Sequence, residues 1–365
     1  MQRSLKEIIK NTIIQKSKPI GFDEFMDLAL YYPAKGYYSG GMQKFGEQGD
    51  FITAPETSDL FGFCLARQCI QILDGTNDIL EFGAGSGVLA AQVLFELGRL
   101  GQLPKNYYIL ELSAELQQRQ QDTIAKILPE LMDRVVWLNG LPENFSGVVI
   151  ANEVLDAMPA KRLIYQAGKF KELGVDCQND ALVWQTKSIY NNDKMRLPTE
   201  VTQGYITEVN ERAIAWVESL SETMDKGLVL LIDYGIGREE YFHPQRGAGT
   251  LRCYYQHKAS ENPFVHIGKQ DITTSVNFSD IAEAAERGGF EVQGYATQAL
   301  FLISLGIDEY LLAEQETDKR ASLAQQVKQL VLPSAMGESF KVLALVKDTQ
   351  VELQGFKEQN LLHKL

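Results

Sequence analysis

The chain has 365 residues, of which 45% are hydrophobic and 23% are charged, and its 35 basic and 48 acidic residues give a formal net charge of −13. These are globular proportions, which exclude collagen-like, low-complexity and wholly disordered chains. The negative charge argues against nucleic acid as the principal partner, because proteins that bind the phosphate backbone carry a concentrated positive field.

Cysteine and histidine are sparse, with four of each, and no C-x-x-C spacing occurs. This pattern excludes a disulfide scaffold and a zinc module, so we expect reduced thiols, a cytoplasmic location and no metal. The chain contains no run of about eighteen apolar residues, and no membrane span is expected.

The first 75 residues are predicted to form a helical and loop region that covers the active site. Apolar residues between Leu5 and Ile13 recur at helical spacing, which favours a basic amphipathic helix over a targeting segment. Residues 31–56 are dense in Gly, Pro and Tyr and should be irregular, whereas residues 58–73 regain helical periodicity.

From residue 78 onward the pattern alternates between strands and helices. The expected strands are continuous apolar runs, which indicates that both faces of the sheet are covered, as in a parallel sheet. The sequence therefore predicts a doubly wound α/β domain over residues 76–365. Its strands are expected at 78–82, 107–112, 135–138, 147–153 and 228–234, with helices at 88–100, 114–128 and 211–224.

Two insertions interrupt this alternation. Residues 160–205 hold short β-like runs, and residues 236–276 are loop-rich and carry three of the four histidines. A helix at 280–289, a strand at 290–296, two further helices and a strand at 340–346 are expected to follow.

A glycine-rich loop follows the first expected strand. Glu81 lies at the end of the strand, and Gly83, Gly85 and Gly87 come directly after it, before a helix. Glycines allow a sharp turn and close approach of a ligand to the backbone, with the helix N-terminus facing that ligand. A tight turn without any ligand is the alternative interpretation.

Two nucleoside cofactors are compatible with this loop. Residues 85–90 fit the dinucleotide pattern G-x-G-x-x-A, but the turn begins at Gly83, and in that register the third glycine would fall on Val88. The Glu81 carboxylate would repel a pyrophosphate and attract a cofactor that carries an amino group. S-adenosylmethionine (SAM) is such a cofactor. Glu111, after the second strand, is placed to accept hydrogen bonds from ribose hydroxyls, which is common to SAM and NAD folds.

The fourth expected strand ends in polar residues, Asn152 and Glu153, with Asp156 close behind. Ligands of open α/β sheets bind beyond the carboxyl ends of the strands, so these side chains should face the reactive end of the cofactor. Capping of the next helix is the competing interpretation, and for Asp156 the two are evenly matched.

Together these motifs resemble the MidA-like family of class I SAM-dependent methyltransferases, whose mitochondrial members are complex I assembly factors that methylate an arginine. The resemblance covers nearly the whole chain. It rests on Ala29-Leu30-Tyr31-Tyr32-Pro33 with Gly36-Tyr37-Tyr38, Gly49-Asp50-Phe51-Ile52-Thr53-Ala54-Pro55-Glu56, the loop 81–87, Ala151-Asn152-Glu153 with Asp156-Ala157-Met158-Pro159, Asp233-Tyr234-Gly235, Gly249-Thr250-Leu251-Arg252 with His257, and Asp271-Ile272-Thr273 with Val276 and Phe278.

The chain departs from the family pattern at three positions. Ala84 and Ser86 replace the proline and the arginine of a loop that usually reads G-P-G-R-G, and Ile267 stands where a proline usually precedes Gly268. Recognition of a carboxylate by that arginine therefore does not carry over. The glycines remain, which keeps the expectation of cofactor binding.

The resemblance implies a Rossmann-like α/β fold with a mostly parallel seven-strand sheet in the order 3-2-1-4-5-7-6 and an antiparallel last strand. It implies SAM as cofactor and methylation of arginine in a protein substrate, with no nucleic acid partner; a homodimer is compatible with it. The expected cofactor-binding residues are Glu81, Gly83, Ala84, Gly85, Gly87, Glu111, Leu112, Thr53 and Pro55, and the catalytic candidates are Asn152, Glu153, Asp50, Glu56 and His257.

Three classes of function stay open at this point. The first is a protein arginine methyltransferase, in which carboxylates hold the guanidinium bidentately. The second is a methyltransferase of the same fold that acts on a small molecule or another residue. The third is an assembly factor that binds SAM without turnover. A fold alone does not decide among them.

Overall fold

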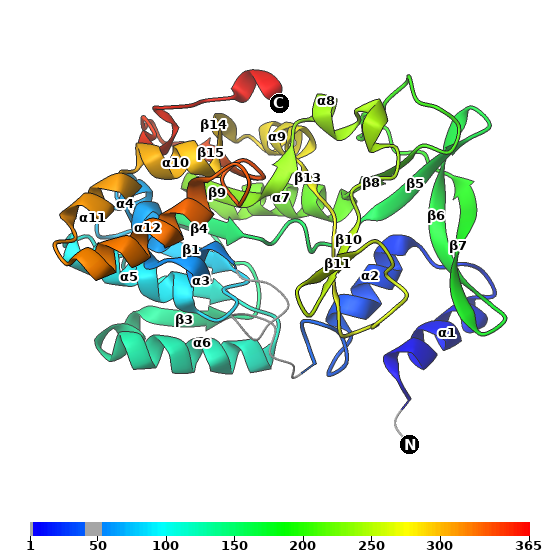
Figure 1. Ribbon diagram of the computed structural model, residues 1–365, viewed down its shortest axis with the longest axis horizontal. Helices are drawn as coiled ribbons and strands as arrows, with labels where there is room; N and C mark the ends of the chain where they lie inside the picture. Colours follow the sequence, from blue (N-terminus) through cyan, green and yellow to red (C-terminus); the bar gives the residue numbers. More distant parts are fainter. Residues whose placement is uncertain (1–2, 41–52) are drawn as a thin grey trace. The chain divides into compact units, whose positions relative to one another are not determined.

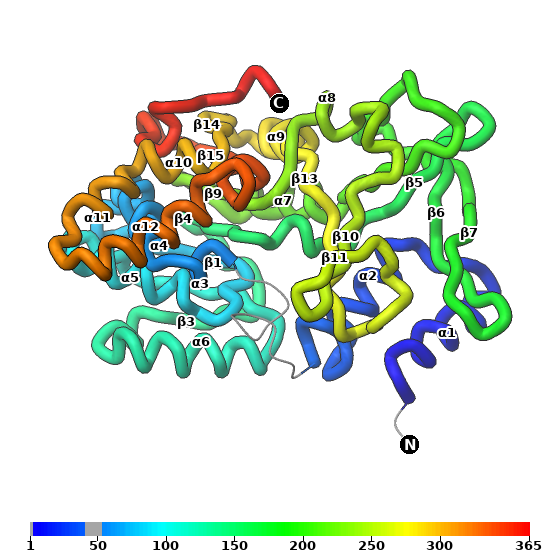
Figure 2. Tube along the Cα trace, viewed as in Figure 1, coloured from blue at the N-terminus to red at the C-terminus, as the bar shows by residue number. Residues whose placement is uncertain are grey.

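The computed structural model describes residues 3–40 and 53–365 (Figure 1). The chain divides into two compact units. Unit 1 comprises Met1–Phe51, Leu155–Trp216 and Ile236–Asp280, and unit 2 comprises Ile52–Val154, Val217–Gly235 and Ile281–Leu365. Figure 2 traces the path of the chain between the units. The chain leaves unit 2 after strand β4 (Phe145–Asn152), returns in helix α7 (Glu211–Thr223), leaves again at the end of strand β9 (Met224–Ile236) and returns in helix α9 (Phe278–Arg287).

Unit 2 is built on a sheet in the order β3-β2-β1-β4-β9-β15-β14. Strands β1 to β4 and β9 pair in parallel, while β15 pairs antiparallel with both β9 and β14. In chain order this is 3-2-1-4-5-7-6, so the predicted fold and its antiparallel strand are confirmed. The strands are β1 (Asp78–Phe82), β2 (Tyr107–Leu110), β3 (Val135–Leu138), β4 (Phe145–Asn152), β9 (Met224–Ile236), β14 (Glu291–Thr297) and β15 (Phe340–Lys347).

Helices pack on this sheet through one continuous apolar core. Alternate strand residues such as Ile79, Ile109 and Ile150 enter that core, because successive side chains of a strand point to opposite faces. The helices of unit 2 are α3 (Ala54–Thr57), α4 (Asp59–Cys69), α5 (Val88–Arg99), α6 (Ala114–Ile127), α10 (Gln298–Ser304), α11 (Ile307–Ala313) and α12 (Thr317–Val331), with the 3-10 turns η1 (Pro129–Arg134), η3 (Gln354–Phe356) and η4 (Leu362–Lys364). The unit boundary falls within α7 (Glu211–Thr223) and α9 (Phe278–Arg287).

Unit 1 begins with two helices, α1 (Leu5–Lys16) and α2 (Phe22–Tyr31). Ser4 and Glu7 form a capping box at the start of α1, and its apolar face is buried, as the periodicity predicts. Residues 32–40 are turns. Helix α3 begins at Ala54, so the end of the segment expected to be irregular is a short helix instead.

The two insertions supply the sheets of unit 1. Strands β5 (Lys161–Gln166), β6 (Lys169–Gln178), β7 (Ala181–Ile189) and β8 (Ile206–Val209) form an antiparallel sheet in the order β7-β6-β5-β8. The segment expected to be loop-rich contains a second sheet, β11-β10-β12, which sequence reasoning missed. The strands of this sheet are β10 (Arg252–Tyr255), β11 (Lys258–Ser260) and β12 (Asp271–Thr273). The helices α8 (Arg238–Tyr241) and η2 (Pro244–Arg246) precede the sheet in the chain, and the short strand β13 (Val276–Asn277) follows it.

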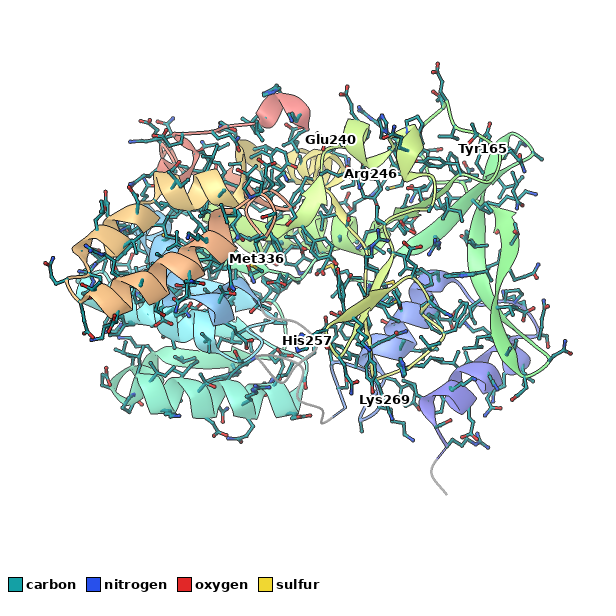
Figure 3. All side chains as sticks on the ribbon, in the orientation of Figure 1. Tyr165, Glu240, Arg246, His257, Lys269 and Met336 are labelled. Carbon is teal, nitrogen blue, oxygen red and sulfur yellow. The ribbon has the colours of Figure 1, made fainter. Side chains whose placement is uncertain are left out.

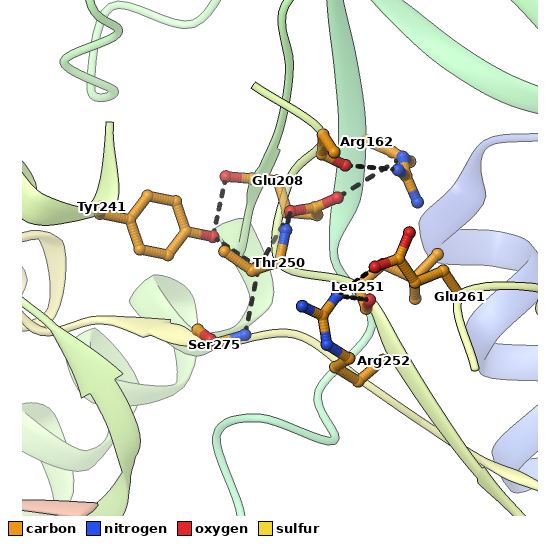
Figure 4. A network of polar contacts seen from close by, with 9 residues as sticks. Arg162, Glu208, Tyr241, Thr250, Leu251, Arg252, Glu261 and Ser275 are labelled. Atoms are coloured by element: carbon orange, nitrogen blue, oxygen red, sulfur yellow. Dashed lines mark hydrogen bonds and ion pairs between the residues drawn. The ribbon is translucent and has the colours of Figure 1, made fainter. Parts of the chain in front are cut away.

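A buried polar network holds this second sheet within unit 1 (Figure 4). The Glu208 carboxylate accepts hydrogen bonds from the backbone N–H of Thr250 (2.6 Å) and from its hydroxyl (2.9 Å), and lies 3.5 Å from Arg162 Nε. The Thr250 hydroxyl oxygen in turn accepts from the Ser275 N–H (3.2 Å). A buried carboxylate is stable only when it is paired and hydrogen-bonded in this way.

No described helix is long and apolar enough to cross a membrane. The four cysteines are free thiols. Within residues 3–40 and 53–365, no group of three or more His, Cys, Asp or Glu side chains could hold a metal ion.

Candidate functional site

The glycine-rich loop lies between β1 and α5 in a conformation that only glycine adopts easily. Gly83, Gly85 and Gly87 have φ angles of 59°, 54° and 83°. A Cβ on Gly87 would lie 2.9 Å from Gln120 Cα, which is closer than side chains approach. The backbone therefore turns tightly in front of the N-terminus of α5, an arrangement that presents N–H groups to a ligand.

Glu81 is a buried carboxylate at the carboxyl end of β1. The Tyr107 hydroxyl donates a hydrogen bond to Glu81 Oε2 at 2.6 Å. Burial raises the pKa of Glu81 to about 7, the hydrogen bond from Tyr107 opposes this rise, and the nearby negative charge of Glu111 adds to it. A positively charged ligand group beside Glu81 would favour its ionised form.

Glu111 follows β2 and is tied to the glycine-rich loop through Gln120 of α6. Gln120 Nε2 donates to Glu111 Oε2 (3.1 Å) and to the Gly85 carbonyl (3.2 Å), while Gln120 Oε1 accepts from Trp137 Nε1 (2.9 Å). The Ser113 N–H donates to Glu111 Oε1 at 2.9 Å. This network fixes the position of the carboxylate that the sequence predicts for the ribose.

Sequence reasoning missed Tyr107 and Gln120. The available signal for Gln120 was its position, because it lies between Leu116 and Ile124 on the buried face of α6. A polar amide at such a core position needs hydrogen-bond partners within the protein.

Asn152 and Glu153 lie at the carboxyl end of β4. Glu153 has a φ of 54°, an uncommon left-handed conformation for a residue other than glycine, and its N–H donates to the Ile232 carbonyl of β9 at 2.9 Å. Asn152 Nδ2 donates to Glu153 Oε1 at 3.3 Å. Asn152 Oδ1 is buried and has no hydrogen-bond partner among the described residues, so it can accept from a ligand.

The other expected site residues are distributed between the two units. In unit 2, Pro55 and Ala84 are buried, while the Leu112 side chain is 80% exposed. Thr53 is the N-cap of α3, which contains Glu56. Asp50 lies outside the described residues.

His257 belongs to unit 1, where it lies in the tight turn between β10 and β11 and is exposed (Figure 3). Gln256 and His257 both have positive φ angles, 47° and 59°. Asp156 also belongs to unit 1 and is buried there. The roles of all these residues stay predictions.

The carboxyl ends of the central strands in unit 2 fit a nucleoside cofactor with a cationic group. A glycine loop with positive φ angles, two buried carboxylates and one buried amide oxygen without a partner among the described residues occur at the ends of adjacent strands β1, β2 and β4. Residues 64–296 match the family model described as "Putative S-adenosyl-L-methionine-dependent methyltransferase". The chain belongs to this methyltransferase family.

Two solved structures are similar to this chain over nearly its whole length. A crystal structure from Burkholderia thailandensis, bound to S-adenosyl-homocysteine, is 39% identical, covers 99% of this chain and 96% of its own, and superposes with a TM-score of 0.95. The native form from the same organism is 38% identical, covers 99% and 96% of the two chains, and has a TM-score of 0.91.

Mitochondrial proteins named protein arginine methyltransferase NDUFAF7 are more distant. The protein of Homo sapiens is 28% identical, covering 95% of this chain and 84% of its own length, and that of Mus musculus is 27% identical, covering 95% and 85%. The predicted family and the predicted cofactor, SAM rather than NAD, are confirmed.

The ionisation of Glu81 leads to a pH-dependent expectation for this methyltransferase. If the SAM ammonium lies beside Glu81, binding must lower a carboxyl pKa that is about 7 in the free protein. Binding should then release protons between pH 6 and 7, and affinity should fall as the pH drops through that range, by up to about tenfold per pH unit below the pKa.

Calorimetry of SAM binding in buffers with different ionisation enthalpies measures this release. Glu81→Gln should bind SAM more weakly without that proton release. Equal proton release by Glu81→Gln and the wild type would place the titrating group elsewhere.

Proposed function

We propose that this methyltransferase transfers a methyl group from SAM to a guanidinium nitrogen of an arginine in a protein substrate. The names of the NDUFAF7 relatives, which span most of this chain, support arginine as the acceptor. The observation that carries the proposal is the conformation of Glu153, whose carboxylate is held by a strained backbone at the end of β4.

A left-handed conformation costs a non-glycine residue about 1–3 kcal/mol, and such strain is concentrated at functional sites. Helix capping, the competing interpretation for a polar residue at this place, does not require a long carboxylate side chain. Glutamate also lacks the local tolerance of asparagine for this conformation. The strained backbone therefore favours a role for the Glu153 side chain itself.

Methyl transfer from a sulfonium is an in-line displacement that needs the acceptor nitrogen about 3 Å from the methyl carbon. SAM supplies the electrophilic methyl group when it is bound. A carboxylate matches the fork geometry of a guanidinium, so Glu153 would orient the acceptor through paired charge-assisted hydrogen bonds. The N–C bond would form as the S–C bond breaks, S-adenosyl-homocysteine would leave as a neutral thioether, and the attacking nitrogen would release one proton to solvent. Asp50 and Glu56 are the alternative acids for this task.

Incubation of the protein with radiolabelled SAM and a cell lysate, followed by acid hydrolysis of the labelled protein, tests the proposal. We expect label in methylated arginine. Label in another amino acid or in a small molecule would move the chain to a different acceptor. SAM binding without any transfer of label would identify a non-catalytic SAM-binding protein.

A further inference from the structure

One face of the paired strands β10 and β12 in unit 1 carries polar side chains that have no role in the proposed methyl transfer. In β12, Ile272 belongs to the apolar core of unit 1, so Asp271 and Thr273 point to the opposite face. Asp271 is 3% exposed and Thr273 is 2% exposed. Both are therefore polar groups enclosed by protein.

Two tyrosines and a second acid belong to the same neighbourhood. The Tyr38 hydroxyl donates to Asp271 Oδ1 at 3.0 Å, and the Tyr38 ring stacks on Tyr31 with ring centroids 5.5 Å apart. The carbonyl of Asp156, a residue that is 5% exposed, accepts from the Thr274 N–H at 3.0 Å. Burial raises the pKa of Tyr38, and the negative charges of Asp271 and Asp156 add to that rise, so both carboxylates act on this ring.

The Thr273 hydroxyl lies on the same face of β12 as Asp271. Its Oγ1 is buried and has no hydrogen-bond partner within the described residues. Removal of a hydroxyl from water without a replacement partner costs free energy. Side chains two residues apart along a strand are separated by about 7 Å. One ligand group with hydrogen-bond donors on two of its sides can therefore reach both Asp271 and Thr273.

The ligand implied by these groups is a planar cation. A guanidinium carries five N–H donors around its rim, and its flat faces stack on aromatic rings. It therefore suits a site where acceptor oxygens lie beside tyrosine rings. Arg252, on the same face of the sheet, is directed to other partners: its Nη1 donates to the Leu251 carbonyl (2.9 Å) and to Glu261 (3.0 Å).

We propose that Tyr31, Tyr38, Asp156, Asp271 and Thr273 form a subsite in unit 1 that binds a guanidinium side chain of the polypeptide substrate. The inference rests on the proposed function, because it assumes an arginine-containing acceptor. It adds, within unit 1, a recognition site for the substrate that carries this acceptor.

Thr273→Val gives the sharpest test, because valine preserves the shape and removes only the hydroxyl. The probe is N-acetyl-arginine methylamide, titrated by NMR into the full chain with S-adenosyl-homocysteine present, and the matched neutral probe is the corresponding citrulline derivative. We expect the arginine probe to bind at least tenfold better than citrulline. Thr273→Val should lose about tenfold in affinity for it, as for one hydrogen bond to a charged group.

Thermal stability separates this role from a structural one. Thr273→Val should be as stable as the wild type or more stable, since the hydroxyl that it removes has no partner in the protein. Thr250→Val removes a buried hydroxyl that has partners, and it should lower the melting temperature. Asp271→Asn, which still accepts hydrogen bonds, should weaken binding of the arginine probe by tenfold or more.

Equal binding of the two probes, or unchanged affinity in both Thr273→Val and Asp271→Asn, overturns the subsite. The labelled-SAM assay on a lysate reports separately on the proposed function. If methylarginine forms but the variants bind the arginine probe as the wild type does, arginine methylation is supported and this subsite is excluded. If the label appears in another acceptor but the variants still bind the arginine probe more weakly than the wild type, the guanidinium subsite is supported and arginine methylation is excluded.

Discussion

Replacement of Glu153 by glutamine is expected to lower methyl transfer by about 100-fold or more, while the protein stays folded and binds SAM with near wild-type affinity. The substitution keeps the size of the side chain and its ability to accept from Asn152 Nδ2. It removes the charge that orients a guanidinium, and such a charge-assisted contact is worth about 2–3 kcal/mol in the transition state. Transfer of label and calorimetric SAM binding on one preparation measure both effects.

Glu153→Gly is the matched variant. Glycine adopts the φ of 54° at this position without strain, so the melting temperature should stay the same or rise while transfer is lost. Near wild-type transfer by both variants would exclude Glu153 and move the assignment to Asp50 and Glu56. A parallel loss of SAM affinity would assign Glu153 to the cofactor site.

Gly85→Val is expected to abolish measurable SAM binding, with a loss of affinity of about 100-fold or more, while the sheet stays folded. Valine is a β-branched residue forced here to a φ of 54°, and it adds a bulky side chain to a loop whose backbone is expected to approach the cofactor. Calorimetry measures the loss of binding, and circular dichroism reports on the fold.

Gly101→Val provides the control for backbone strain. Gly101 also has a positive φ, 70°, and a Cβ there would meet nothing within 4 Å. Both variants should lose stability, by about 1–2 kcal/mol, but only Gly85→Val should lose SAM binding. Normal SAM binding by Gly85→Val would show that the cofactor lies away from this loop.

Most of the α/β sheet could be predicted from the sequence, because its strands are continuous apolar runs separated by amphipathic helices. The sheet β11-β10-β12 could not, for two reasons. Strand β11 is exposed along its length and shows no apolar alternation. The turn that precedes it uses Gln256 and His257 at positive φ, where the usual sequence signal is Asn-Gly or Asp-Gly.

Local sequence patterns also could not predict which segments pack together to form unit 1. Its core joins Phe25 of α2 to Val175 and Ile272 of the two insertions, residues that are far apart in the chain. At the candidate site, the glycines and the strand-end acids were visible because each follows an apolar run. Tyr107 and Gln120 were not, since their function depends on partners that only the folded chain brings together.

The threading of the chain has a consequence for how the protein is made. Strands β4 and β9 pair side by side, yet the whole segment Leu155–Trp216 lies between them in sequence. The core of unit 1 contains Ile9 near its start and Ile272 near its end. During synthesis the apolar faces of α1 and α2 therefore stay without their native packing partners until much later residues are made. The contacts between these distant residues close long loops, which slows folding. No continuous fragment consists of unit 1 alone, so the first helices complete their packing only after β12 has emerged from the ribosome.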